Sequence, residues 1–324
     1  MKAVLCTRYC APDELELRDL PDPVAGPGEA VVRVRAAALN FFDTLIIAGK
    51  YQTKPAFPFS PAAEFAGEVE SIGPGVTAVQ PGDRVAANIG YGAAREKVAV
   101  AADRLVKLPD GLEFERAAGL IVTYGTTLYA LKNRAALAAN ETLAVLGAAG
   151  GVGIAAVELG KLMGARVIAC ASADDKLAFT RRHGADATVN YATEDLKEAL
   201  RRLTDGKGPD VIYDPVGGPY AEPALRAIAW GGRFLVVGFA AGEIPKLPLN
   251  LVLLKSCDVR GVFWGGWSDR DRAGYRANNL EIMQWCARGK LSAHVHQVFA
   301  LSEIAAALRA LAGRQAMGKI VLKP

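Results

Sequence analysis

The chain has 324 residues, and at roughly 150 residues per domain this length predicts two domains. Lys and Arg number 38 against 34 Asp and Glu, the net charge is +4, and apolar residues make up 51%. This composition is typical of a globular protein and excludes a disordered chain or a strongly basic nucleic-acid binder. The longest uncharged stretch, residues 142–157, is too short to span a membrane, and no secretory leader is evident.

The first 120 residues contain short alternating segments separated by glycine and proline turns. Alternation predicts strands over residues 30–38 and 64–71, and shorter strands over 83–87, 96–100 and 104–108. Turn sequences such as Gly73-Pro74-Gly75 and Pro81-Gly82-Asp83 lie between them. This pattern indicates an all-β, barrel-like unit.

The pattern changes near residue 120, where apolar strands begin to alternate with helices. Strands are predicted over 142–146, 166–171, 187–190, 210–213, 233–237 and 258–264, and helices over 154–163, 174–183, 194–204 and 220–230. Such alternation is typical of βαβ units and a parallel sheet. The tail adds helices over 272–288 and 302–312 and strands over 295–300 and 319–323.

Glycine is in excess, with 34 residues, and four of them fall within residues 147–153. Gly147, Gly150 and Gly153 form a GxxGxxG pattern between a strand and a helix, with Gly164 as the expected cap of that helix. In this context small residues let the backbone amides of Gly150, Gly151, Val152 and Gly153 approach a dinucleotide pyrophosphate. Gly153 is also expected to let the helix pack closely on the sheet. The alternative is a tight packing turn without a ligand.

The end of the next strand favours NADPH over NADH. An acidic residue that would bind the ribose 2′-hydroxyl of NADH is absent, and Ser172 stands there with Lys176 four residues on. A small hydroxyl and a lysine suit a 2′-phosphate. Asp174 and Asp175 would repel it if they faced it, but they fit the first turn of a helix.

Cysteine and histidine offer no metal site. The five cysteines are scattered, and Cys6 and Cys10 lack further ligands nearby, as do His294 and His296 on a predicted strand. Buried thiols in a reducing cytoplasm are the expected state.

With these residues in hand, the whole chain resembles the zinc-independent, zeta-crystallin-type quinone oxidoreductases of the medium-chain dehydrogenase/reductase superfamily. The resemblance rests on Leu39-Asn40-Phe41-Phe42-Asp43, Pro81-Gly82-Asp83-Arg84-Val85, residues 147–153, Val189-Asn190-Tyr191, Val236-Val237-Gly238-Phe239 and residues 250–264. It implies an α/β protein with a GroES-like β-rich catalytic domain (1–121 and 266–324), a Rossmann domain with a doubly wound parallel sheet that binds NADPH (122–265), and an active site in the cleft between them. Asn40 and Ala63 replace the Cys and His zinc ligands of alcohol dehydrogenases, so no metal is expected. Ala62 stands where the family often has glycine.

The resemblance also implies the site residues. Asn40 would lie beside the substrate, with Asp43 near it in sequence as a functional or a structural group. Tyr51 and Tyr124 are candidates for pocket walls and hydroxyl donors, or for core aromatics. Lys319 could reach the cofactor, but a surface position is favoured. The adenosine end of NADPH would meet Ser172, Lys176 and Tyr191, and the nicotinamide side would meet Val237, Gly238, Phe239, Val262, Phe263 and Trp264.

The implied activity is NADPH-dependent reduction of quinones by hydride transfer without a metal, with the last proton from water. The alternatives are reduction of an enone, enal or acryloyl thioester, and a non-catalytic, crystallin-like NADPH-binding protein. A cytoplasmic homodimer without nucleic-acid or membrane partners is expected, with strand 258–264 as the dimer edge suggested by relatives.

Overall fold

The computed structural model describes residues 1–324, which divide into two compact units. Unit 1 comprises Met1–Val122 and Asp271–Pro324, and unit 2 comprises Thr123–Arg270. Unit 1 is therefore discontinuous in sequence. No helix in the chain has the length and apolar character needed to cross a membrane.

Unit 1 is built on a seven-stranded sheet. Its strands are β3 (Glu29–Leu39), β4 (Glu64–Ile72), β5 (Arg84–Asn88), β6 (Lys97–Ala101), β7 (Val106–Lys107), β14 (Val295–Ala300) and β15 (Lys319–Lys323). The order is β14-β15-β3-β4-β5-β7, and β6 also pairs with β3. A separate hairpin joins β1 (Lys2–Leu5) to β2 (Glu16–Asp19). The inward side chains of these strands form one apolar core.

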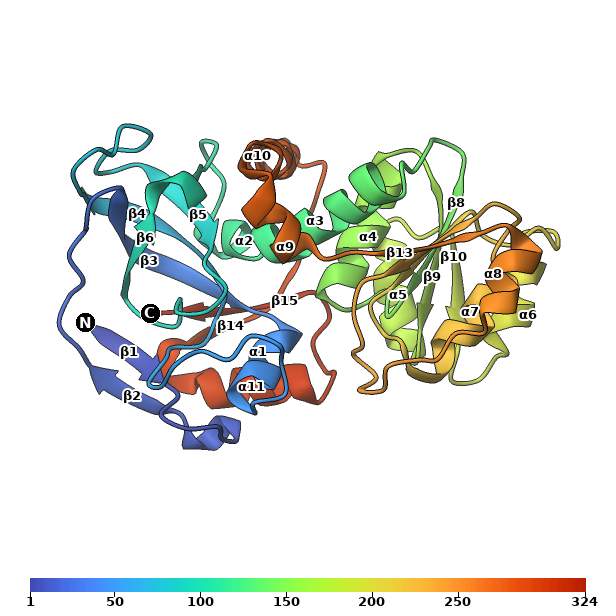
Figure 1. The fold of residues 1–324 in the computed structure, drawn as a ribbon, viewed down its shortest axis with the longest axis horizontal. Helices are drawn as coiled ribbons and strands as arrows, with labels where there is room; N and C mark the ends of the chain where they lie inside the picture. The colour runs from blue at the N-terminus through green and yellow to red at the C-terminus, as the bar shows by residue number, and fades with distance from the viewer. The chain divides into compact units, whose positions relative to one another are not determined.

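The C-terminal strand is central to unit 1. β15 pairs antiparallel with β3, placing Ile320 opposite Leu39, and parallel with β14. In Figure 1 the red strand β15 at the end of the chain lies beside blue β3. Unit 1 also contains α1 (Phe41–Ile47), α2 (Phe114–Ala118), α10 (Arg272–Ala287) and α11 (Ile304–Ala312). The expectation of an all-β unit was wrong in omitting α1 and α2, which are too short to show a helical period.

Unit 2 is a parallel sheet of six strands. They are β8 (Thr142–Leu146), β9 (Arg166–Ala171), β10 (Ala187–Asn190), β11 (Val211–Asp214), β12 (Arg233–Val236) and β13 (Asp258–Gly261), in the order β10-β9-β8-β11-β12-β13. The strand order reverses at β8 and β11, so the predicted doubly wound, Rossmann-type sheet is confirmed.

Helices connect these strands. They are α4 (Gly151–Leu162), α5 (Asp174–Arg182), α6 (Leu196–Arg202), α7 (Ala221–Ala227), α8 (Leu249–Lys255) and α9 (Trp264–Arg270), with α3 (Leu120–Leu128) leading into the unit. The predicted bounds of β9, β10, β14 and β15 agree with the structure. The strand predicted over 258–264 ends at Gly261, because its partner β12 ends at Val236.

Candidate functional site

The glycine turn after β8 brings backbone atoms very close together. Gly147 has a φ of +58°, and Gly150 is the N-cap of α4. A Cβ on Gly153 would lie 2.2 Å from the Gly147 carbonyl oxygen, so only glycine fits there. The turn is compact, opens a helix and lies where the strand order reverses, which is the arrangement that a pyrophosphate needs.

A different glycine packs α4 on the sheet. A Cβ on Gly160 would lie 2.7 Å from Leu143 Cδ2 and 3.0 Å from Val167 Cγ2, which belong to β8 and β9. The close approach predicted for Gly153 is therefore to the turn itself, and Gly160 makes the helix–sheet contact. Gly164 follows the helix with a φ of +84°, as expected of a capping glycine.

The residues predicted for the adenosine end lie after neighbouring strands. Ser172 follows β9 and is exposed, Lys176 is half-buried in the first turn of α5, and Tyr191 follows β10. The ring centroids of Tyr191 and Tyr220 lie 4.3 Å apart. Because parallel strands end at one edge of the sheet, these residues share the edge that carries the glycine turn.

The residues predicted for the nicotinamide side follow β12 and β13. Asp214 Oδ1 accepts hydrogen bonds from the amides of Val216 and Gly217, which folds the chain after β11. Burial raises the pKa of Asp214 despite these bonds. Phe239 is 39% exposed beyond β12, and Phe263 is 65% exposed beyond β13, whereas Trp264 is buried.

Unit 1 contains a buried polar cluster of Asn40, Glu64 and Lys319. Lys319 Nζ donates to Leu39 O (2.9 Å), Asn40 Oδ1 (2.7 Å) and Glu64 Oε1 (2.8 Å). Asn40 Nδ2 donates to Glu64 Oε1 at 2.9 Å, and Val122 N donates to Glu64 Oε2 at 2.7 Å. Lys319 is 3% exposed. The favoured surface position for Lys319 was wrong, because its charge is paired with Glu64 inside the core.

This cluster fixes the side-chain amide of Asn40. The amide oxygen must face the lysine donor and one amide hydrogen must face the glutamate acceptor, so a flipped amide would place like groups together. The second Nδ2 hydrogen has no partner within the chain. Asn40 can therefore donate one further hydrogen bond from a fixed position.

Asp43 lies at the edge of this cluster and is fully buried. Its Oδ2 accepts from the Asn40 amide at 2.7 Å, which closes the first turn of α1. Burial raises the pKa of Asp43 to about 7, against the lowering effects of the Asn40 amide and of Lys319. A carboxyl of this kind exchanges its proton near neutrality.

The two candidate tyrosines have different surroundings. Tyr51 stacks on Phe42 with ring centroids 5.4 Å apart, and burial raises its pKa. Tyr124 is buried in unit 2, and its hydroxyl donates to Glu158 Oε2 at 2.9 Å. Glu158 also lies 2.6 Å from His183 Nδ1. Tyr124 thus has the surroundings of a core aromatic with a bonded hydroxyl.

Ala62 adopts a left-handed conformation, with a φ of +65°, and is fully buried. This conformation favours glycine, because the Cβ of other residues crowds the following carbonyl. The backbone therefore gives a physical reason for the glycine that the resembling family often has at this position.

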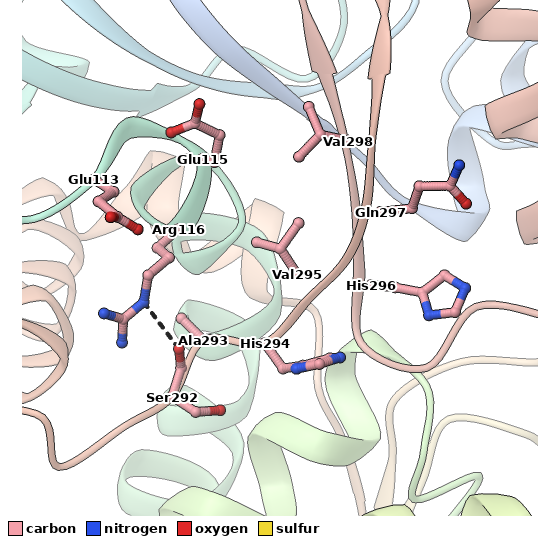
Figure 2. A pocket seen from close by; sticks show the side chains of 10 residues that line it. All are labelled: Glu113, Glu115, Arg116, Ser292, Ala293, His294, Val295, His296, Gln297 and Val298. Atoms are coloured by element: carbon pink, nitrogen blue, oxygen red, sulfur yellow. Dashed lines mark hydrogen bonds between the residues drawn. The ribbon is translucent and has the colours of Figure 1, made fainter.

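The cysteines and histidines do not gather into a set of metal ligands. The Sγ atoms of Cys6 and Cys10 lie 3.8 Å apart, both thiols are free, and burial raises the pKa of Cys6 to about 12. His294 and His296 border an open pocket of about 610 Å³ with Glu113 and Arg116, shown in Figure 2. β14 has a bulge between Val295 and Gln297. The chain holds no group of three or more His, Cys, Asp or Glu side chains that could bind a metal.

Each of the two units contains residues that match a known protein family. Residues 26–110 match a family model described as an alcohol dehydrogenase GroES-like domain, and residues 151–277 match one described as a zinc-binding dehydrogenase. The chain is 37% identical to a quinone oxidoreductase of Pseudomonas aeruginosa, over 100% of this chain and 99% of that protein. The chain belongs to the quinone oxidoreductase family.

Further relatives also match nearly the whole of this chain. A quinone oxidoreductase-like protein 2 homolog of Nematostella vectensis is 36% identical over 99% of this chain and 88% of its own length. The solved structure of Escherichia coli quinone oxidoreductase complexed with NADPH superposes with a TM-score of 0.94, at 28% identity over all of both chains. A 2-haloacrylate reductase superposes with a TM-score of 0.88, at 28% identity, over 100% of this chain and 99% of its own. The resemblance to medium-chain dehydrogenases/reductases is confirmed.

Sequence reasoning missed the role of Glu64 and the burial of Lys319. One signal was present, since each is a charged residue at the start of a strand and is followed directly by apolar residues, Phe65-Ala66 and Ile320-Val321-Leu322. A charge beside residues that must be buried requires a partner. The sequence does not show that partner, because Glu64 and Lys319 are 255 residues apart.

Proposed function

We propose that this protein is an NADPH-dependent oxidoreductase that reduces quinones by hydride transfer. The observation that carries the proposal is the glycine turn, in which a Cβ on Gly153 would collide with backbone, at the reversal point of a doubly wound sheet. The solved relative with NADPH and the quinone oxidoreductase relatives support it.

The residues present fit this cofactor. The amides of Gly150, Gly151, Val152 and Gly153 would hold the pyrophosphate at the N-terminus of α4. Ser172, Lys176 and Tyr191 would hold the adenosine 2′-phosphate, since a hydroxyl and an ammonium suit it and no acidic residue ends β9. Val237, Gly238, Phe239, Val262, Phe263 and Trp264 would border the nicotinamide.

The polar cluster of unit 1 would serve the acceptor. When bound, NADPH supplies a hydride to an electron-poor carbonyl compound. Asn40 would donate its free amide hydrogen to the oxygen that becomes negative, and Glu64 and Lys319 hold the amide in place. Asp43 and Tyr51 would lie behind this donor, and the final proton would come from water.

Turnover with a panel of quinones tests the reaction. The purified protein should oxidise NADPH, followed by its absorbance, in proportion to the quinone added. Asn40→Ala should lower kcat while leaving NADPH affinity unchanged, whereas Asn133→Ala, on unit 2, should leave both unchanged. Tight NADPH binding without turnover of any quinone or enone would instead support the non-catalytic alternative.

Reduction of α,β-unsaturated carbonyl compounds is the second candidate. The superposition with a 2-haloacrylate reductase favours it, because the same fold there carries a reductase of an activated alkene. Parallel assays with quinones and with enones or acryloyl thioesters distinguish the two. The higher kcat/KM identifies the substrate class.

The choice of cofactor is tested at Lys176. Lys176→Ala should lose most of the preference for NADPH over NADH, because the ammonium would no longer pair with the 2′-phosphate. Lys246→Ala, an exposed lysine of the same unit, is the matched control. An unchanged preference in Lys176→Ala would show that the phosphate lies elsewhere.

A cytoplasmic homodimer completes the proposal. β13 is the edge strand of unit 2, and Leu249 and Leu253 of neighbouring α8 are each 78% exposed. Asp258 N and Val262 N bond toward β12, so the amide of Val259 faces the free edge. Val259→Pro should therefore block pairing across this edge and yield monomers in sedimentation, while β12 stays paired. The five free thiols support a reducing compartment.

A further inference from the structure

Unit 1 contains a second pocket. It has a volume of about 330 Å³ and is lined chiefly by Phe59, Ser60, Ile89, Tyr91, Arg95 and Val98. None of its lining residues belongs to the predicted catalytic or cofactor set. Its walls come from the loop before β4, from the segment between β5 and β6, and from β6 itself.

Arg95 is the unusual member of this lining. Its guanidinium makes no hydrogen bond or ion pair within the chain, and its Nε is buried without a partner. Burial alone lowers its pKa, with no contribution from any acidic group. By contrast, half-buried Arg233 makes a two-point contact with Glu141. A partly desolvated guanidinium without a counter-charge is costly and favours the binding of an anion.

The walls indicate what kind of anion fits. Ile89 and Val98 are apolar, and the rings of Phe59 and Tyr91 meet edge to face with centroids 5.9 Å apart. Ser60 donates its hydroxyl to Ala94 O and is not free to serve a ligand as donor. Arg95 is thus the one cationic group among apolar and aromatic walls. A small inorganic anion would make no favourable contact with these apolar and aromatic walls.

We propose that this pocket binds a small organic carboxylate with a flat apolar body. The carboxylate would take the paired N–H groups of the Arg95 guanidinium, which match its two oxygens. The apolar body would lie against Phe59, Ile89 and Tyr91. This binding requires no cofactor and is independent of the proposed reduction.

Benzoate is the probe, and the thermal midpoint and calorimetric affinity are the readouts. Benzoate should raise the midpoint of the wild type and bind at least about tenfold more weakly to Arg95→Met, since a charged hydrogen-bonded contact is lost. Arg276→Met removes an exposed arginine of the same unit and should bind like the wild type. Benzyl alcohol, which has the ring without the charge, should have no effect.

Three results would overturn the proposal: no benzoate binding to the wild type, equal binding to Arg95→Met, or an equal effect of inorganic sulfate. If Arg95→Met does not fold, a crystal grown with bromobenzoate decides the question. Anomalous bromine signal in the pocket beside Phe59 and Tyr91, with the carboxylate on Arg95, supports the site, and its absence there refutes it. Because NADPH oxidation is not measured, failure of the proposed reductase activity would leave this result unchanged.

Discussion

Lys319 places all three of its ammonium hydrogens on acceptors inside unit 1. One acceptor is the amide oxygen of Asn40 and another is the carboxylate of Glu64, which itself receives an amide hydrogen from Asn40. The three side chains form a closed ring of hydrogen bonds. The position of the candidate substrate donor therefore depends on a residue at the far end of the chain.

The first prediction concerns this lysine. Lys319→Met should lower the free energy of unfolding by about 3–5 kcal/mol, because buried Glu64 would lose the partner of its ion pair. Urea denaturation measures the change. Lys323→Met removes an exposed lysine of the same strand, paired with Glu115, and should cost less than about 1 kcal/mol. Equal effects of the two substitutions would contradict a buried ion pair.

The second prediction concerns Asp43, whose pKa is raised from 3.8 to about 7 in the folded protein. Between these values the folded state keeps a proton that the unfolded state has released, so stability from this group falls as pH rises. The loss is about 1.4 kcal/mol per pH unit. This loss of stability has not begun below pH 3.8, the pKa of Asp43 in the unfolded chain, and it is complete above pH 7.

Asp43→Asn removes this titration. The stability of the variant relative to the wild type should increase from pH 4 to pH 7, as measured by denaturation at several pH values. Asp19→Asn, an exposed carboxyl on β2, serves as the control. A difference between Asp43→Asn and wild type that does not change with pH would show that the buried carboxyl is ionised throughout.

Sequence reasoning found Asn40 and Asp43 through the resemblance, but it could not describe their surroundings. Residue type alone says that a lysine prefers water, and Lys319 violates that preference because Glu64 neutralises it. The unpaired state of Arg95 is equally invisible in sequence, since it is an absence of contacts. Such features depend on distances between segments that are remote in the chain.

At the scale of elements, the turn between β8 and α4 requires glycine most strictly at position 153. Gly153→Ala should destabilise unit 2 by about 1–3 kcal/mol and weaken NADPH binding, because the new Cβ would displace the Gly147 carbonyl. A Cβ on Gly150 would lie 3.4 Å from the same oxygen, an ordinary contact, so Gly150→Ala should cost less, about 0.5–1 kcal/mol, because alanine is a poorer N-cap than glycine. Calorimetry of both variants, with and without NADPH, checks this order.

Elements with a clear period were predictable, and those without one were not. β9 is a buried apolar segment closed by a turn residue, so its limits could be read from the sequence, whereas in β10 only Val189 is buried. α1 has only seven residues and contains Leu45-Ile46-Ile47, which shows no helical spacing. Its first turn is closed by Asp43, which accepts the backbone amide of Asn40 three residues earlier.

At the scale of the whole molecule, the parallel sheet of unit 2 followed from alternating strands and helices. The return of the tail to unit 1 did not follow from any pattern and was inferred from the resemblance alone. The pairing of β15 with β3 joins residues about 280 positions apart, and no local signal encodes such a contact. The roles of the two domains in catalysis stay predictions.

Truncation of the C-terminus tests whether the fold of unit 1 depends on β15. A chain ending at Met317 lacks β15 and Lys319, so β3 and β14 would lose their common neighbour. Hydrogen exchange should become fast throughout unit 1 and stay slow in the sheet of unit 2. Uniform loss of protection in both units would show that they unfold as one. A chain shortened only by Pro324 is the control.

The position of β15 also has a consequence for how the protein is made. Residues 123–270 leave the ribosome as one continuous stretch, so unit 2 can reach its fold while translation continues. Unit 1 is the first to start folding and the last to complete its fold, because the partner strand of β3 lies in the final six residues of the chain. Until then the edge of β3 and the carboxylate of Glu64 are uncovered in a nascent chain. Slow termination or a missing tail would therefore leave unit 1, and not unit 2, as the part that chaperones must protect.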